Sequence, residues 1–163
     1  ETANHLCRAE IERFRAAFDV KVMGTIELCR EALRLMSARR SGVIVNIIGL
    51  AGERPNPKSV ATSTANAALI AFTQAVGAAS VDHNVRVVGV NPGLIATGRT
   101  AGMMDPANSV DNKAYQHLLR ALPFGRMGLP EEVADLVVFL ASARASYMSG
   151  TVYTVDGGAR FRI

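Results

Sequence analysis

Apolar side chains recur at spacings of three, four or seven residues through the first part of the chain, which is the period of an amphipathic helix. The pattern predicts one long helix from about Glu10 to Ala38. Gly24 interrupts this pattern, so we expect either a close packing contact or a bend there. The basic residues and the glycine of 39–42 are typical of a helix end.

Three apolar runs predict strands. Residues 43–48 and 85–90 are nearly continuous apolar segments, and 151–155 is a shorter one. Such runs are typical of parallel strands covered by helices on both faces of the sheet. An alanine-rich segment from Val60 to Val81 predicts a second helix, which we expect to be buried on more than one side. Another helix begins at Pro130, with acidic residues in its first turn.

Residues 94–127 lack this regularity, apart from one short helical stretch near 113–121. Long irregular segments in a compact domain are more often functional than not. Helices between successive strands predict an α/β fold with a parallel sheet and right-handed crossovers. Three strands are few for such a domain, and the first helix has no strand before it. The order therefore predicts the second half of a doubly wound sheet.

Composition and charge exclude several classes of protein. The chain has 163 residues, of which 49% are hydrophobic and 20% charged, so disorder is not expected. No uninterrupted apolar stretch is long enough to predict a membrane span. Cys7 and Cys29 are too few for a disulfide scaffold, which indicates a reducing, cytoplasmic compartment. The net charge of +4 comes from scattered basic residues, so we expect no nucleic-acid partner. His5 and His83 have no partners at metal-ligand spacing, so we expect no metal site.

Several short motifs follow one another in a fixed order. Residues 123–134 read PFGRMGLPEEVA, followed by FLAS at 139–142 and VDGG at 155–158. The Asn-Pro-Gly of 91–93, with Thr97 after it, directly follows the second predicted strand. These motifs resemble the C-terminal part of the short-chain dehydrogenase/reductase family, and the resemblance covers nearly the whole chain. Within the family, the bacterial acyl-carrier-protein reductases look most similar.

The resemblance implies a fold and an activity. It implies a Rossmann-like doubly wound parallel sheet, of which residues 1–163 form a single partial domain, the substrate and nicotinamide half. The family's phosphate-binding glycine loop lies in a dinucleotide-binding half that this sequence lacks, so we expect a longer protein. A truly short product is the alternative, but it would expose the apolar edge of 43–48. Family members exchange hydride between NAD or NADP and a carbonyl or alcohol. We therefore expect an oxidoreductase, with a non-catalytic oligomerisation or scaffold protein as the alternative.

The family's proton-handling positions carry other residues here. The family uses a Tyr, a Lys four residues later, a Ser some thirteen residues before the Tyr, and an Asn on the preceding helix. Aligned on the Ala-Ala-Leu of 67–69, these positions fall on Thr62, Asn66, Gly49 and Lys21. One gap would move the Tyr position to Ser59, with the same conclusion. Because a threonine hydroxyl is a far weaker acid than a tyrosine, Thr62 cannot replace the proton donor by chemistry alone.

Lys21 is the candidate for the missing amine, because the Asn and Lys positions of the family line one pocket. The alternative is a lysine whose stem packs on the protein and whose ammonium reaches water. The resemblance also implies that backbone around Pro92, Gly93 and Ile95 contacts the nicotinamide carboxamide. By the same resemblance, the Thr97 hydroxyl is placed to reach a phosphate.

Other side chains have two interpretations each. Tyr115 and His117 are either proton donors to a bound carbonyl or part of a lid surface. Met103 and Met104 either contact an apolar substrate or pack within that lid. Tyr147 and Tyr153 flank the last strand, where we expect packing or interface roles.

Subunit contacts are also implied by the resemblance. The helices at 10–38 and 60–81 resemble the pair that forms a four-helix bundle between subunits, so we expect a homodimer or homotetramer. Small side chains that suit close helix contact are Ala65, Ala68, Ala71 and Ala75. Ordinary packing within one chain is the alternative. The other expected partner is a small-molecule carbonyl or alcohol.

Overall fold

Three parallel strands form the centre of the molecule, in the order β1–β2–β3. They are β1 (Gly42–Ile47), β2 (Val85–Pro92) and β3 (Val152–Val155). The computed structural model describes residues 11–100 and 122–162. β2 pairs with β1 on one side and with β3 on the other, both in parallel register. The predicted parallel α/β sheet is confirmed, and each strand lies within two residues of its predicted bounds.

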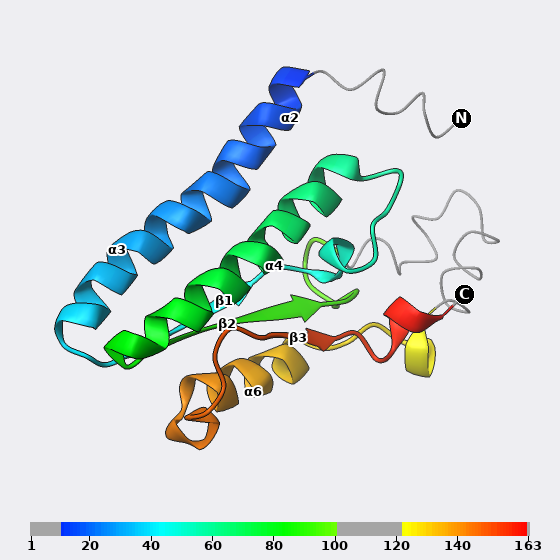
Figure 1. Ribbon diagram of the computed structural model, residues 1–163. Helices are drawn as coiled ribbons and strands as arrows, with labels where there is room; N and C mark the ends of the chain where they lie inside the picture. The colour runs from blue at the N-terminus through cyan, green and yellow to red at the C-terminus, as the bar shows by residue number, and fades with distance from the viewer. Residues whose placement is uncertain (1–10, 101–121, 163) are drawn as a thin grey trace.

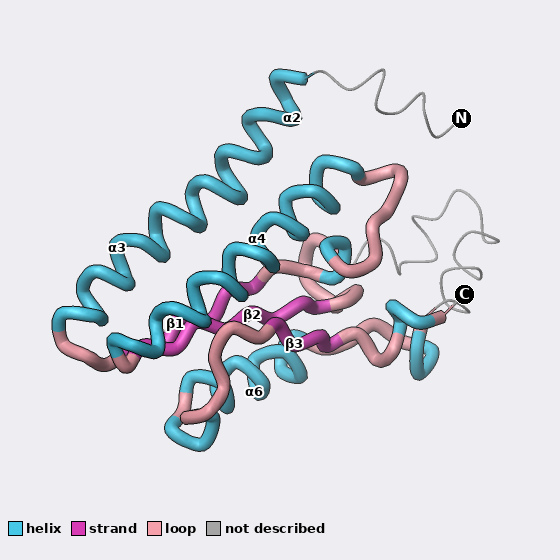
Figure 2. The backbone as a smooth tube through the Cα atoms, in the orientation of Figure 1, coloured by secondary structure: helices cyan, strands magenta, loops and turns pink. Residues whose placement is uncertain are grey.

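Helices cover both faces of this sheet, as Figure 1 shows. The long N-terminal helix and α4 (Val60–Ser80) lie on one face, and α6 (Pro130–Ala141) lies on the other. Figure 2 shows the strands between these layers, with β2 in the middle. Because the three strands are parallel, their carboxyl ends lie at one edge of the sheet, which is where ligands bind in such folds.

The N-terminal helix is continuous but changes its winding in the middle. It comprises α2 (Ile11–Phe18), a π-helical turn (Asp19–Met23) and α3 (Gly24–Ala38). The nearest neighbour to a Cβ added at Gly24 would be the Asp19 carbonyl oxygen, 3.9 Å away. The interruption at Gly24 therefore marks the π-helical turn rather than a close contact. Such turns are frequent at functional sites.

The end of α3 differs from the glycine stop that the sequence suggests. Arg40 takes the left-handed conformation, with φ of 51°. The Ser41 amide then donates to the Met36 carbonyl over 3.1 Å. Gly42 already belongs to β1, and a Cβ at this position would collide with the Met36 side chain. The glycine is therefore required by packing and not by the turn.

α4 buries one stripe of its surface rather than two. The buried positions recur every three or four residues; they are Ser63, Asn66, Leu69, Thr73, Gly77 and Ser80, with Ala65 beside them. Ala71 and Ala75 on the opposite side are exposed. The expectation of burial on more than one side is therefore wrong for the described chain, because nothing in its described residues covers the outer alanines.

α4 also meets the length and apolarity that a membrane span requires. With the 3₁₀ turn Val81–His83 that follows it, the helix extends over Val60–His83, and an 18-residue window within it has a mean hydropathy of 1.2. Thr, Ser, Asn and Gln residues interrupt this segment, so it does not contradict the expectation of no uninterrupted apolar stretch of that length. The helix packs against β2 and against the Leu50–Gly52 turn, and core helices of non-membrane proteins have the same composition. The composition of α4 is thus accounted for by its contact with the sheet.

α6 begins as the sequence predicts, with Pro130 in its first turn. The Glu132 carboxylate accepts the Leu129 amide hydrogen over 2.7 Å and pairs with Arg126 over 2.8 Å. These hydrogen bonds, first the one from Arg126, lower the pKa of Glu132 to about 2. Within residues 11–100 and 122–162, the short 3₁₀ turns besides Val81–His83 are Leu50–Gly52, Pro123–Gly125, Ala143–Ala145 and Ala159–Phe161. The helical stretch expected at 113–121 lies outside the described residues.

Candidate functional site

A cleft of about 710 Å³ opens at the carboxyl ends of β1 and β2. Its walls come from the π-helical turn, the segment after β1, the first turns of α4, the loop after β2 and the first turn of α6. All eight residues predicted for the site line it: Lys21, Gly49, Thr62, Asn66, Pro92, Gly93, Ile95 and Thr97. The structure therefore brings the predicted positions together, while the chemical role of each stays a prediction.

Lys21 enters the cleft from the π-helical turn. Its side chain is half-buried, and Nζ donates to the Ile48 carbonyl over 3.2 Å. Burial, and then the positive charge of Arg99, lower the pKa of Lys21 below its ordinary value. The Thr25 hydroxyl donates to the Lys21 carbonyl over 2.6 Å, which holds the backbone of this turn. The ammonium is thus placed at the end of β1 and is easier to deprotonate than a solvated lysine.

Asn66 fixes the segment that follows β1. The side chain is 2% exposed, and its amide nitrogen donates to the Gly49 carbonyl over 3.0 Å. The Gly49 amide in turn donates to the Asn91 side chain over 3.2 Å. Gly49 has φ of 123°, a conformation that favours glycine. Asn66 Oδ1 is buried without a hydrogen-bond partner among the described residues. Asn66 therefore supports the wall of the cleft. The lysine that the family has at this position would instead place a positive charge there.

Thr62 is exposed in the first turn of α4 and lines the cleft. Ser59, the alternative Tyr position, directly precedes α4 and is not among the residues that line the cleft. Of the two alignments considered for the proton donor, the one on Thr62 therefore places a hydroxyl in the cleft. Because the Thr62 hydroxyl is a very weak acid, it can donate a hydrogen bond but does not give up its proton.

The backbone at Ile95 offers a donor and an acceptor together. Ile95 forms an isolated parallel bridge with Gly128. The two bridge hydrogen bonds use the Ala96 amide (2.8 Å) and the Leu94 carbonyl (3.0 Å), so the Ile95 amide lies on the other side of the chain. The Ile95 carbonyl accepts the Thr100 hydroxyl over 2.6 Å and keeps a second lone pair. A primary carboxamide requires this pairing of one donor with one acceptor.

Gly93 and Thr97 complete this wall. A Cβ at Gly93 would lie 2.8 Å from Asp156 Cβ, so only glycine lets the chain pass this close to the end of β3. The Thr97 hydroxyl lies 3.1 Å from the Thr100 hydroxyl, and the Thr97 amide donates to the same oxygen over 2.7 Å. This wall fits the nicotinamide side of a dinucleotide. The expected phosphate contact of Thr97 stays a prediction.

Sequence reasoning missed two charged residues in the cleft. Arg54 follows the 3₁₀ turn after β1, and Arg99 lies in the loop after β2. Both lie seven residues after the end of a strand, and this position is the one signal that could have found them. The Arg54 guanidinium donates to the Ala159 carbonyl and, over 3.0 Å, to the Arg162 carbonyl. Arg54 therefore ties the last 3₁₀ turn to the cleft.

Sequence reasoning also missed the hydrogen-bonded group around Glu53. Glu53 accepts hydrogen bonds from Asn91 (2.7 Å) and Thr154 (2.8 Å) and pairs with Arg160. Burial alone would raise the pKa of Glu53, but the hydrogen bonds from Thr154, Arg160 and Asn91 outweigh it and lower the pKa. Because these partners come from β2, β3 and the last turn, the group joins three segments next to the cleft.

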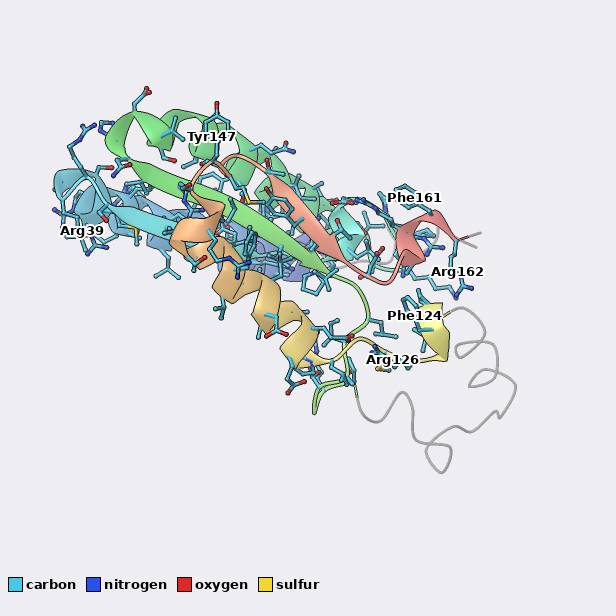
Figure 3. The ribbon with its side chains drawn as sticks, turned by 90° about the horizontal axis from the view of Figure 1, so that it is seen from below. Arg39, Phe124, Arg126, Tyr147, Phe161 and Arg162 are labelled. Atoms are coloured by element: carbon cyan, nitrogen blue, oxygen red, sulfur yellow. The ribbon has the colours of Figure 1, made fainter. Side chains whose placement is uncertain are left out.

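The remaining candidates lie away from this site or outside the described residues. Tyr153 packs against the buried cluster beneath α6, as predicted. Tyr147 is fully exposed at the opposite end of the sheet from Phe124 and Phe161 (Figure 3), so it has no packing role in this chain. The described residues contain no group of three potential metal ligands. The candidates Tyr115, His117, Met103, Met104 and His5 all lie outside the part described.

Comparison with known proteins finds one family throughout the chain. A family model described as enoyl-(acyl carrier protein) reductase matches residues 2–160. The chain is 35% identical over 153 residues to the 3-oxoacyl-(acyl-carrier-protein) reductase FabG of Chlamydia muridarum. That match covers 94% of this chain and 59% of the relative. The chain thus spans about three fifths of the length of this relative.

Solved structures agree with the fold. YwfH, described as an NADPH-dependent reductase involved in bacilysin biosynthesis, superposes with a TM-score of 0.87 at 33% identity. The match covers 96% of this chain and 61% of YwfH. L-sorbose reductase from Gluconobacter frateurii, solved with NADPH and L-sorbose, has a TM-score of 0.85 at 28% identity. This match covers 96% of this chain and 62% of the L-sorbose reductase chain.

Proposed function

Because the chain belongs to the short-chain dehydrogenase/reductase family, we propose that the complete protein interconverts a carbonyl compound and an alcohol with NAD or NADP. The observation that carries this proposal is the shared cleft at the carboxyl ends of the strands. It holds all eight positions that the family resemblance singles out, although their segments are far apart in the sequence. NADPH is the form to test first, because it appears in the descriptions of two similar structures.

The wall at Ile95 supports the cofactor part of the proposal. When bound, the nicotinamide supplies hydride exchange with the substrate carbon. The Ile95 amide and carbonyl would hold the carboxamide, and Gly93 allows the close approach of the backbone. The Thr100 hydroxyl bonds to the Ile95 carbonyl and keeps this loop in place. These residues orient a planar ring at the mouth of the cleft.

Lys21 is the proposed proton donor in place of the family's tyrosine. As the carbonyl oxygen gains negative charge, the ammonium donates a proton to it and leaves a neutral amine, which takes up a proton from solvent. A lowered pKa suits this role, because it brings proton donation closer to neutral pH. Thr62 donates a hydrogen bond to the same oxygen, and Asn66 keeps the wall beside it in place through Gly49.

Assembly through the helices at 10–38 and 60–81 is part of the proposal. The outer face of the N-terminal helix carries exposed apolar side chains, with Val20 80% and Leu28 76% exposed. The exposed Ala71 and Ala75 of α4 would allow a second helix pair to approach closely. An apolar stripe of this kind favours a homodimer or homotetramer over an isolated subunit. A cytoplasmic location is also proposed, and the free thiol of Cys29 accords with a reducing compartment.

Turnover by the full-length protein tests the activity. NADPH oxidation is followed with a panel of ketones and aldehydes. Replacing Lys21 by Met should lower kcat by about 10²- to 10⁴-fold, which is the usual contribution of a proton donor. Lys21→Arg should also be slow, because a guanidinium does not release its proton. Lys58→Met is the matched control, since Lys58 is exposed and does not line the cleft.

The pH profile separates a proton donor from a structural lysine. Reduction requires the charged form of Lys21, so kcat should fall as the pH rises through its lowered pKa. A Lys21→Met variant with wild-type kcat would show that another group donates the proton. Tight NADPH binding without turnover on the whole panel would overturn the proposed activity and favour the scaffold alternative.

A further inference from the structure

The charged side chains that line the cleft are all positive among the described residues. Lys21, Arg54 and Arg99 line it, and no aspartate or glutamate is found among its described lining residues. By contrast, the described arginine at the start of α6, Arg126, is neutralised by Glu132. Three cations around one cavity create a positive potential that attracts anions.

The acidic residue nearest to the cleft in the sequence is engaged elsewhere. Glu53 directly precedes Arg54, but its carboxylate pairs with Arg160 and accepts hydrogen bonds from Asn91 and Thr154. Neither Glu53 nor Arg160 lines the cleft. The carboxylate is thus neutralised by its own arginine and does not compensate the cations of the cleft.

Lys21 and Arg99 face the same cavity and repel each other. After burial, the charge of Arg99 is the second cause that lowers the pKa of Lys21. Arg54 differs from both, because its guanidinium is held by two backbone carbonyls of the C-terminal segment. Like charges on one cavity raise the free energy of the protein, and a bound anion relieves that repulsion. The Lys21–Arg99 pair therefore indicates an anionic ligand.

We propose that the cleft selects carbonyl substrates that also carry a carboxylate, with Arg99 binding the carboxylate while Lys21 faces the carbonyl oxygen. The inference rests on the proposed function, because it names the substrate class of that same cleft. A short 2-oxo or 3-oxo acid meets the requirement, since its carbonyl and carboxylate are close enough to reach two neighbouring cations. Arginine suits the second position, because its planar guanidinium binds a carboxylate through two parallel hydrogen bonds.

Substrate preference tests this proposal directly. The full-length protein is assayed with NADPH on pyruvate against methyl pyruvate and on acetoacetate against methyl acetoacetate. We expect the wild-type protein to have the higher kcat/KM for the acid of each pair. Arg99→Gln should lower the acid-to-ester ratio of kcat/KM by about tenfold or more, as expected for a charged hydrogen bond. Arg99→Lys should keep the larger part of the ratio.

Arg144→Gln is the matched control, because it removes the same charge from an exposed turn outside the cleft. It should leave the acid-to-ester ratio unchanged, whereas a general effect of net charge would lower the ratio in both variants. A wild-type preference for the esters, or an unchanged ratio in Arg99→Gln, would overturn the proposal. The same holds if Arg99→Gln weakens NADPH binding alone, since its charge would then serve the cofactor phosphates.

A binding measurement separates this inference from the proposed activity. Pyruvate and methyl pyruvate are titrated into protein saturated with NADP⁺, which allows no reduction, and the Lys21 amine is followed by NMR. A carboxylate beside Lys21 should raise its pKa, whereas the neutral ester should not. Acid-selective binding by a protein that never turns over would retain the carboxylate site and reject the reductase. Turnover without any preference for acids would retain the reductase and reject the carboxylate site.

Discussion

The two faces of the sheet are built from different chemistry. Each face buries an apolar cluster: Val88, Val90, Leu140 and Ala145 beneath α6, and Val22, Ile48, Ala65 and Leu69 on the α4 face. The α4 face also contains a chain of buried polar groups. The Cys29 thiol contacts Asn46 Oδ1 at 3.3 Å, and the Asn46 amide donates to the Thr73 hydroxyl over 3.0 Å. Lys21 and Asn66 of this second face line the cleft, and Pro130 and Val133 of α6 line it from the other face.

This difference shows what each face contributes. Apolar contacts are non-directional, so the α6 face supplies stability while tolerating small adjustments. Hydrogen bonds between Cys29, Asn46 and Thr73 are directional and join α3, β1 and α4 in one arrangement. The helices that position Lys21 and Asn66 are thereby held in register with the end of β1. We therefore expect substitutions in the buried cluster beneath α6 to change stability, and those in the Cys29–Asn46–Thr73 chain to change the site as well.

The largest loss of stability should come from the α6 face. Leu140 is completely buried, so Leu140→Ala removes its packing and leaves a cavity. We expect a loss of about 2–5 kcal/mol in the free energy of unfolding, measured by urea denaturation. NADPH binding by the folded variant should stay at the wild-type level. A large change in cofactor affinity would show that the two faces are not independent.

Replacing a helical glycine by alanine usually stabilises a protein, but close packing on the α4 face should make this substitution destabilising at Gly77. A Cβ at Gly77 would collide with the backbone of Val87 and Gly150, so Gly77→Ala should cost about 1–3 kcal/mol. Gly24→Ala is the matched control, because nothing but the Asp19 carbonyl lies within 4 Å of its Cβ. It should gain up to about 1 kcal/mol from the preference of helices for alanine. Thermal unfolding of both variants checks the opposite signs, and a stable Gly77→Ala would contradict the close contact.

The buried polar chain can be tested as a pair. Thr73→Val leaves the Asn46 amide without its acceptor, and we expect a cost of about 1–3 kcal/mol. Asn46→Leu similarly removes the partner of Thr73 and should cost about as much. The double variant removes both polar groups, so its cost should be clearly less than the sum of the two. Additive costs in urea denaturation would mean that the Asn46–Thr73 hydrogen bond does not couple α4 to β1.

The smallest effect should come from the exposed pair at the start of α6. The pKa of Glu132 is about 2, below its ordinary value of 4.5, so its contribution to stability is present above pH 4.5. That contribution should be lost as the pH falls from 4.5 through about 2. Glu132→Gln should be less stable than wild type at pH 7 and equal to it near pH 2. An NMR titration should also find that Arg126→Gln raises the pKa of Glu132.

Some features were predictable because their signal is local. The apolar runs at 43–48 and 85–90 predicted buried parallel strands, since such strands need apolar side chains on both faces. The acidic turn after Pro130 predicted the start of α6 to the residue. The π-helical turn Asp19–Met23 was not predictable, because a local change of hydrogen-bond register leaves the spacing of apolar residues nearly unchanged.

Burial and charge at the site were harder to predict. The alanines of α4 are compatible with either a buried or an exposed face, because a small side chain suits both, and the outer face is exposed in this chain. Arg54 and Arg99 come from different loops and meet only because β1 and β2 are neighbours. Family motifs identified the position of Lys21, but its hydrogen bond to Ile48 and its charged neighbour depend on the π-helical turn.

The amino-acid sequence by itself determined the order of helices and strands, the parallel sheet and the family of this protein. Each of these depends on hydrophobic periodicity or on motifs that are continuous in the chain. The tertiary structure alone decided that three cations share one cleft, that Glu53 pairs with Arg160, and that Asn46 and Thr73 are buried against each other between β1 and α4. The physical reason is that electrostatic and hydrogen-bond interactions depend on distance in space, which distant segments acquire only when the chain folds.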